Sequence, residues 1–150
     1  MGVAALISWL VTAFVGLYLL AVWLIENDVS DPGATRSRLH GSVILGHVLL
    51  ALTGLVFWVI HLLSGSEAAG WAAVGILGGV AILGLTMFTR WIPVHIAYVA
   101  AESGKHGRQL ADYDFPAERA FPVAMVMGHG LLAFTTFTLV LLTVLGVGGS

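Results

Sequence analysis

The 150-residue sequence has no cysteine and very little charge. The missing cysteine excludes disulfides, thiolate zinc sites, iron–sulfur ligation and cysteine nucleophiles. Only 9% of the residues are charged, whereas a soluble domain of this size carries roughly 25%. The net charge of −2 gives no reason to expect nucleic acid as a partner. A cofactor would therefore be held by histidine, methionine, carboxylate or backbone groups, and lipid is the expected solvent for most of the surface.

The sequence also lacks the motifs of hydrolases and nucleotide-using enzymes. It has no nucleophile elbow, no phosphate-binding glycine loop, no HExxH and no pair of catalytic carboxylates. The longest segment between its apolar stretches, residues 93–121, is too short to form an enzyme domain of its own. We therefore expect neither a hydrolase nor a transferase. Whether the protein is an enzyme stays open, and a redox role would be that of an electron carrier.

Long apolar stretches make up most of the chain, since 59% of its residues are hydrophobic. A helix needs about 20 apolar residues to cross a bilayer core, and four stretches are long enough: 3–25, 41–63, 71–92 and 122–147. Because lipid offers no hydrogen bonds to the backbone, each stretch must be a helix. The sequence therefore predicts an all-α integral membrane protein, an up-down four-helix bundle forming a single transmembrane domain over residues 1–150.

All lysines and arginines fall on one side of this predicted membrane. They are Arg36, Arg38, Arg90, Lys105, Arg108 and Arg119. The positive-inside rule then predicts both termini outside and the loops 26–40 and 93–121 in the cytoplasm. We expect a prokaryotic cell membrane, with the lipid bilayer and other membrane subunits as partners and no nucleic acid.

Two residue patterns predict how the helices meet lipid and one another. Five tryptophans lie near predicted span ends, which is typical of the aromatic belt at the headgroup level. They are Trp9, Trp23, Trp58, Trp71 and Trp91. Small residues at four-residue spacing predict close helix contacts. They are Ser8, Thr12 and Gly16 in the first span and Gly75 and Gly79 in the third.

A stripe of histidines follows one face of the second span. His40, His47, Gly54 and His61 are each seven residues apart, which leaves successive side chains only about 20° out of line. His47 and His61 are fourteen residues apart, or roughly 21 Å along the axis. Gly54 would leave room between them for a flat ligand to approach the backbone.

The fourth span carries one histidine, His129, between Gly128 and Gly130. His47 and His129 lie about seven and eight residues from the cytoplasmic ends of their spans, so both are expected roughly 10–12 Å below that surface. Two imidazoles at equal depth on different helices can hold one haem iron between them. Gly128 and Gly130 would let a porphyrin edge lie against the helix.

Basic residues at the same membrane face could pair with the haem propionates, since arginine binds carboxylates well. The candidates are Arg36, Arg38, Arg90 and Arg119. Three further histidines, His40, His95 and His106, lie at or beyond this boundary. They could form a surface metal site or the rim of a quinone pocket, or they could be solvated headgroup-level residues.

The helix with His47 and His61, thirteen residues between them, resembles the haem-ligating helices of membrane b-type cytochromes. The four-span layout is similar to their small versions, including the haem-bearing anchors of respiratory dehydrogenases. This resemblance implies haem b as the cofactor, with His47 and His129 as iron ligands and quinone as a possible exchange partner. The sequence departs from a two-haem pattern, because no histidine of the third or fourth span pairs with His61. The resemblance therefore supports one haem better than two.

Simpler interpretations of the histidines remain open. His47 and His129 could make a polar contact between helices, bind a quinone or hold a different metal, and His61 could be an interfacial residue. Met125 and Met127 beside His129 could bind Cu(I), since thioethers suit that ion, or simply pack.

Three functions follow from these alternatives. The first is a haem b protein or redox-complex subunit in membrane electron transfer, exchanging electrons with quinone. The second is a cofactor-free accessory subunit of a larger membrane complex. The third is a small transporter or proton-conducting protein that uses the histidine stripe. Many transporters are built from internal repeats, and no repeat at a fixed period in this sequence supports the third function.

Overall fold

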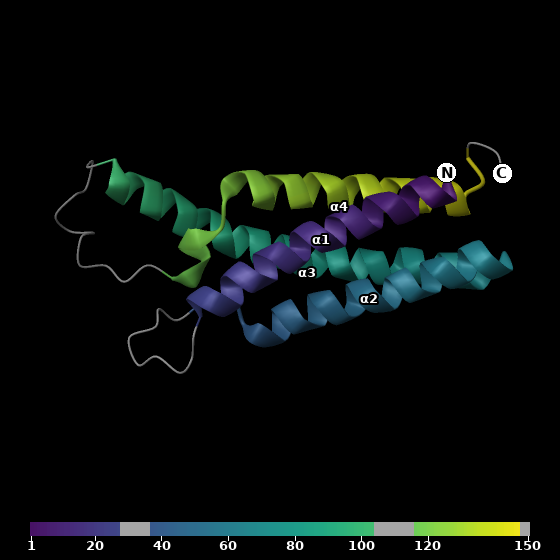
Figure 1. Ribbon diagram of the computed structural model, residues 1–150, viewed down its shortest axis with the longest axis horizontal. Coiled ribbons are helices and arrows are strands. Elements are labelled where there is room, and N and C mark those ends of the chain that lie inside the picture. Colours follow the sequence, from purple (N-terminus) through teal and green to yellow (C-terminus); the bar gives the residue numbers. More distant parts are fainter. Residues whose placement is uncertain (28–36, 104–115, 148–150) are drawn as a thin grey trace.

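The computed structural model describes residues 1–27, 37–103 and 116–147 of the chain. Over these residues it has only helices: α1 (Gly2–Glu26), α2 (Gly41–Ser64), α3 (Glu67–Glu102), the short 3₁₀ helix η1 (Ala117–Ala120) and α4 (Val123–Val144). The four α-helices are each long and apolar enough to span a membrane. They run alternately in opposite directions along a common long axis (Figure 1). The predicted all-α fold with four apolar helices is confirmed, whereas its orientation across the membrane stays a prediction.

The two ends of the bundle differ in what they carry. Both chain termini lie at one end, together with the turn between α2 and α3 (Figure 1), and we call this the terminal end. At the other end, which we call the loop end, α1 and α3 finish, α2 and α4 begin, and η1 packs against α1 and α3. The turn at the terminal end is tight, because Gly65 adopts φ 68° and Ser66 caps α3 by accepting a hydrogen bond from the Ala69 N–H.

Helix α3 is longer than the sequence predicted. The expected span ended at Ile92, but the helix continues through Pro93 to Glu102, so the first part of the predicted loop 93–121 is helical. Proline removes one backbone hydrogen bond but has a φ that suits a helix. The buried residues Trp91 and Val94 lie on either side of Pro93, and their packing holds the helix together across it.

The helices form two closely packed pairs. Contacts are most extensive between α2 and α3 and between α1 and α4, and fewer between α3 and α4 and between α1 and α2. Within the described residues α2 has no close backbone contact with α4, and α1 has none with α3. Helices α2 and α4 are therefore diagonal, and a side chain that joins them must cross the centre of the bundle.

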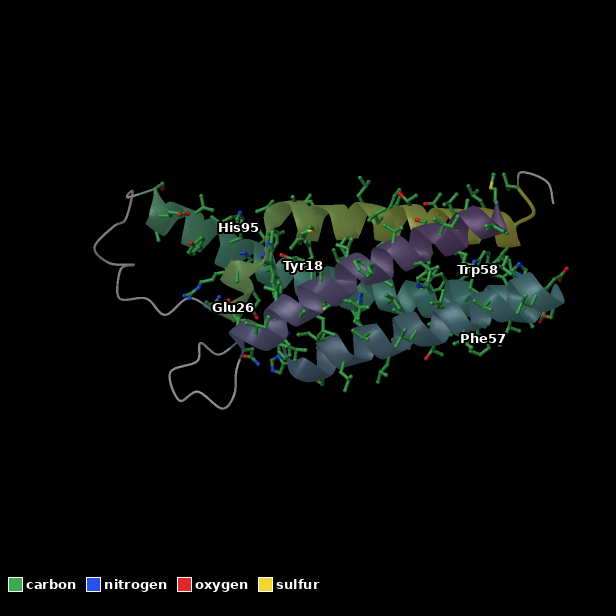
Figure 2. All side chains as sticks on the ribbon, viewed as in Figure 1. Tyr18, Glu26, Phe57, Trp58 and His95 are labelled. Carbon is green, nitrogen blue, oxygen red and sulfur yellow. The ribbon has the colours of Figure 1, made fainter. Side chains whose placement is uncertain are left out.

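The hydrophobic core lies in the terminal half of the bundle. Its buried members are Ala5, Trp9, Trp58, Ala73, Leu77 and Val140. Trp58 is completely buried and lies between the helices in that half (Figure 2). The aromatic-belt interpretation is wrong for Trp9, Trp58 and Trp91, which are at most 5% exposed, and it fits only Trp71, which is 49% exposed, and the half-buried Trp23.

Candidate functional site

The imidazoles of His47 and His129 meet in the loop half of the bundle. Their ring centroids are 6.3 Å apart and their planes are inclined by 57°. His47 stands six residues after the first residue of α2, Gly41, and His129 stands six residues after the first residue of α4, Val123. Both rings are therefore about 9 Å from the start of their helices. The two diagonal helices thus bring together the pair that the sequence predicted.

Each of the two rings is oriented by a backbone carbonyl of its neighbouring helix. His47 Nδ1 lies 3.0 Å from the carbonyl oxygen of Val80, and His129 Nδ1 lies 3.1 Å from that of Thr12. Because a carbonyl oxygen can only accept, each Nδ1 carries the hydrogen and donates it. In the neutral ring this leaves the lone pair on Nε2, which is the atom free to bind a metal.

Each ring also rests on a glycine one helical turn beyond that carbonyl. A Cβ added to Gly84 would lie 3.2 Å from Cε1 of His47, and one added to Gly16 would lie 3.0 Å from Cε1 of His129. A larger residue at either glycine would have to displace the imidazole. The close approach of α3 to His47 and of α1 to His129 therefore depends on Gly84 and Gly16.

The spacing of His47 and His129 fits a shared metal ion. Two imidazoles on opposite sides of one metal have centroids about 6 Å apart, because the metal–nitrogen bond is about 2.0 Å and each nitrogen lies about 1.1 Å from its ring centre. The observed separation is 6.3 Å. Metal-ligating histidines commonly donate their other N–H to a backbone carbonyl, as both do here. The residues present therefore fit a two-histidine metal group.

The donor set favours a metal that brings ligands of its own. Within the described residues no three His, Cys, Asp or Glu side chains gather as a metal site. Structural and catalytic zinc sites take three or four protein ligands, so two imidazoles do not build one. A haem iron has four porphyrin nitrogens and takes only its axial ligands from the protein. Two facing histidines are therefore a fuller donor set for haem than for a bare ion.

The predicted glycine positions fall in different environments. Gly54 is buried, and the space over it is filled, since an added Cβ would lie 3.1 Å from the Trp9 ring and from Ile76. Gly128 and Gly130, which flank His129, face open space, with no atom within 4 Å of an added Cβ. Gly130 is exposed, so this open space lies on the outside of the bundle. The predicted room for a flat ligand over Gly54 is therefore filled by Trp9 and Ile76.

His61 is not brought together with a second histidine in the described part of the chain. Its Nδ1 lies 2.9 Å from the carbonyl oxygen of Ser66, in the turn between α2 and α3, and therefore donates to it. Its ring contacts the Trp58 ring in a tilted arrangement, with centroids 5.1 Å apart and an interplanar angle of 32°, and a Cβ on Gly70 would lie 2.9 Å from Nδ1. His61 thus joins the ends of α2 and α3.

The predicted basic residues lie at the loop end as far as they are described. Arg90 Nη1 donates to Nδ1 of His40 at 3.1 Å and to the carbonyl of Arg38 at 3.4 Å. This links α3 to the residues just before α2. Arg36, also predicted to bind the cofactor, lies outside the described residues, as does His106.

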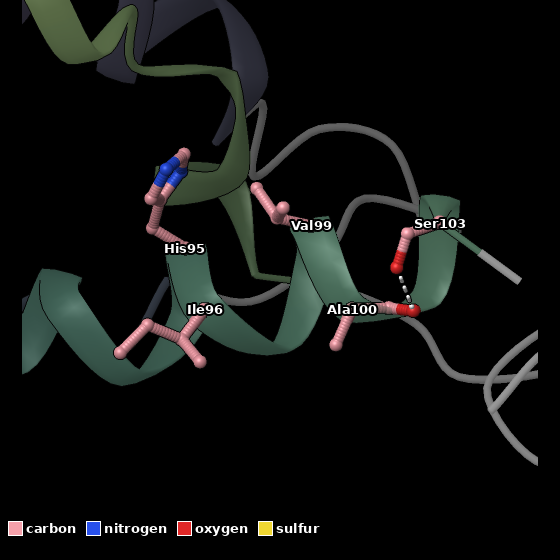
Figure 3. Close-up of a pocket in the computed structure, with 5 residues that line it drawn as sticks. All are labelled: His95, Ile96, Val99, Ala100 and Ser103. Carbon is pink, nitrogen blue, oxygen red and sulfur yellow. Dashed lines mark hydrogen bonds between the residues drawn. The ribbon is translucent and has the colours of Figure 1, made fainter. Parts of the chain in front are cut away.

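His95 lies beside a shallow recess at the loop end of α3. The recess is lined by His95, Ile96, Val99, Ala100 and Ser103 (Figure 3). His95 stacks on Trp91 with ring centroids 5.0 Å apart, and Trp91 stacks on Phe88 with centroids 5.8 Å apart. The buried Nε1 of Trp91 has no hydrogen-bond partner among the described residues. Of this aromatic stack, only His95 lines the recess, so its imidazole is the group that a planar ligand in the recess would contact.

Glu118 is a buried residue that the sequence analysis did not single out. It is 1% exposed, and its Oε1 accepts hydrogen bonds from the Ser37 hydroxyl and, at 2.7 Å, from the Leu39 N–H. Ser37 in turn accepts from Nε1 of Trp23 at 2.8 Å. These bonds join α1, the segment before α2, and η1 at the loop end. In the sequence Glu118 stands beside Arg119 just before the fourth span, where an exposed ion pair would be the ordinary expectation, so no local signal predicted its burial.

A cluster of hydroxyls joins α1 and α4 beside His129. The Ser8 and Thr136 hydroxyls are 2.8 Å apart, and those of Thr12 and Thr136 are 3.1 Å apart. The predicted contact face of Ser8, Thr12 and Gly16 is therefore confirmed, with α4 as its partner. Of the other predicted pair, an added Cβ on Gly79 would lie 3.7 Å from Leu50, whereas Gly75 faces open space.

Comparison with known proteins adds no family to this description. The chain matches no protein-family model, no curated protein and no solved structure. The function must therefore be argued from the arrangement of the residues themselves.

Proposed function

We propose that the protein is a haem b electron carrier of the membrane, in which His47 and His129 are the two axial ligands. The observation that carries this proposal is the pair of imidazoles from diagonal helices, 6.3 Å apart, each with Nδ1 at a backbone carbonyl. A bound haem would supply an iron that gains and loses one electron. As part of the same proposal, the protein is a small b-type cytochrome, and it serves as a subunit of a redox complex.

The chain's own residues would fix the haem in three ways. The carbonyls of Val80 and Thr12 hold the tautomer that leaves Nε2 free. Gly84 and Gly16 let α3 and α1 approach the rings. Arg90, held at the loop end by His40 and Arg38, is placed where a propionate at that end could pair with it.

We further propose that the exchange partner is a membrane quinone and that it binds at the recess beside His95. The recess offers the apolar side chains of Ile96 and Val99 together with the imidazole of His95. That imidazole stacks on Trp91, and its ring nitrogens could bond to a quinone oxygen. Replacing His95 with alanine should slow reduction by a quinol analogue without changing the visible spectrum. Equal reduction rates in the two proteins would contradict this placement.

Two alternatives fit the described contacts less well. A transporter would need the histidine stripe to form a continuous polar path, yet Gly54 between His47 and His61 lies beneath Trp9 and Ile76. A cofactor-free subunit gives no reason for two partly buried imidazoles to meet at the bundle centre with both Nε2 lone pairs free. The polar contacts of the two rings are to backbone carbonyls rather than to each other.

The test is a reduced-minus-oxidised visible spectrum of the purified protein. The wild-type protein should show the sharp α-band of haem b, and both His47→Ala and His129→Ala should abolish it. His61→Ala is the matched control, since it removes a histidine of the same helix that faces no second histidine, and it should keep the band. A colourless wild-type protein after expression with ample haem would disprove the proposal.

A further inference from the structure

The sequences of two helical units of the chain resemble each other. Identical residues of α1 and α3 that are 68 positions apart include Gly2 and Gly70, Ala5 and Ala73, Gly16 and Gly84, and Trp23 and Trp91. Identical residues of α2 and α4 that are 82 positions apart include Gly46 and Gly128, His47 and His129, Ala51 and Ala133, and Thr53 and Thr135. The unit α1–α2 thus corresponds to the unit α3–α4.

The contacts at the histidine pair obey the same symmetry. His47 of the first unit packs on Gly84 and donates to Val80, both in the second unit, whereas His129 of the second unit packs on Gly16 and donates to Thr12, both in the first. The units α1–α2 and α3–α4 therefore make equivalent contacts with each other, related by a pseudo-twofold axis. This axis runs between the two rings.

The same helix pairing can be followed to the terminal end. Along α2 and α3, His47 meets Gly84 and, fourteen residues away on both helices, His61 meets Gly70. Along α1 and α4, His129 meets Gly16, and fourteen residues away Thr143 meets Gly2, whose added Cβ would lie 3.8 Å from Thr143 Cγ2. Thr143 therefore occupies the position that corresponds to His61.

The arrangement around His47 and His129 consists of two histidines and two glycines, and the terminal end keeps three of these four residues. Both glycines are present, as Gly2 and Gly70, and His61 has its Nδ1 at the carbonyl of Ser66. The fourth element, a second histidine, is replaced by Thr143. The interior beside them is filled by Trp58, whose Cζ2 would lie 3.9 Å from a Cβ on Gly2 and which is completely buried.

We infer that the terminal end is a second haem site from which one axial ligand has been lost. This inference rests on the proposed function. It follows that the protein holds one haem, near the loop end, and that electrons enter and leave at that end, because a haem at the terminal end would be needed to carry them further along the bundle. The chain is then a one-sided carrier rather than a conductor of electrons across the membrane.

The test restores the lost ligand. In Thr143→His combined with Trp58→Ala, the haem content should rise from one to two per chain, and removing His61 from that variant should return it to one. Leu145→His combined with Trp58→Ala is the matched control, because Leu145 is 54% exposed, and it should stay at one. A restored variant that retains the first haem but gains no second would overturn the inference.

A second measurement needs no variant. Wild-type protein in vesicles, with an impermeant reductant outside and ferricyanide trapped inside, should reduce its haem from the loop end without reducing the trapped ferricyanide. Two haems per wild-type chain, or electron transfer across the vesicle membrane, would contradict the inference. A wild-type chain without haem would instead disprove the proposed function, and the inference with it.

Discussion

In the terminal half of the bundle the interior is filled by tryptophan and aliphatic side chains, whereas in the loop half the same position holds two imidazoles resting on glycines. Trp9, Trp58 and Val140 are at most 3% exposed, while His47 and His129 are only partly buried. Each half of the bundle contains residues of all four helices. The comparison shows that one end of the bundle is filled as a hydrophobic core, whereas the other brings two histidines together.

The largest effect is expected from filling a glycine beside a ligand. Gly84→Leu should displace His47, since even a Cβ there lies 3.2 Å from the ring, and should lower the affinity for haem by at least about tenfold, as disturbed outer-shell contacts of metal ligands do. Titration of the haem-free protein with haem measures it. Gly78→Leu, on the same helix but facing open space, should retain the wild-type affinity. Equal losses of affinity in the two variants would show that the contact between Gly84 and His47 has no special role.

The next effect should fall on the terminal half alone. Trp58→Ala removes a completely buried indole and should cost about 3 kcal/mol of stability, because the cavity cannot fully close. Denaturation in mixed detergent micelles measures this, with Trp71→Ala, at a position 49% exposed, as a near-neutral control. The haem spectrum should not change. A lost spectrum at retained fold would show that the two halves are not separate.

How far the sequence predicted this arrangement depends on the kind of signal. The four helices followed from apolar length, and the meeting of His47 and His129 followed from equal depth on two spans. The repeat was missed because its two units are offset by different amounts, 68 residues between α1 and α3 and 82 between α2 and α4, so no single period is visible. It emerges only once α3 is known to pair with α2 as α4 pairs with α1.

Other features depended on packing that no local pattern encodes. Trp9 and Trp58 lie near span ends, which suggested the membrane interface, but their rings turn inward over Gly54 and Gly2. Glu118 has no sequence neighbour that reveals its burial, since its partners, Ser37 and Leu39, are about eighty residues away in the chain. Side-chain direction and long-range partners therefore had to come from the structure.

A smaller effect is expected at the loop end from Glu118→Ala. Removing the carboxylate takes away one acceptor of the Ser37 hydroxyl and leaves the Leu39 N–H with only its bond to Ser37 Oγ at 3.0 Å. Because hydrogen bonds to a charged group are lost, this should cost about 2 kcal/mol. Detergent denaturation again measures it, and Glu102→Ala, at an exposed glutamate, should have almost no effect. If the two variants were equally stable, the bonds of Glu118 would not hold the loop end together.

The smallest effect should come from the hydroxyl cluster that joins α1 and α4. Thr136→Val removes the bonds to Ser8 and Thr12 and should cost about 0.6 kcal/mol, the average for such bonds between membrane helices. Thr135→Val is the control, because that hydroxyl bonds only within its own helix, to the Leu131 carbonyl. The haem spectrum of Thr136→Val should stay unchanged. A shifted spectrum would show that the hydroxyl cluster is part of the environment of the haem.

The most direct test of the central claim is the electron paramagnetic resonance spectrum of the oxidised wild-type protein. Two imidazole ligands on one haem iron, His47 and His129, predict a low-spin ferric signal, which His47→Ala and His129→Ala should each convert to high spin or abolish. A high-spin wild-type signal, or a low-spin signal that survives in both variants, would contradict the account of the loop half as a two-histidine haem site.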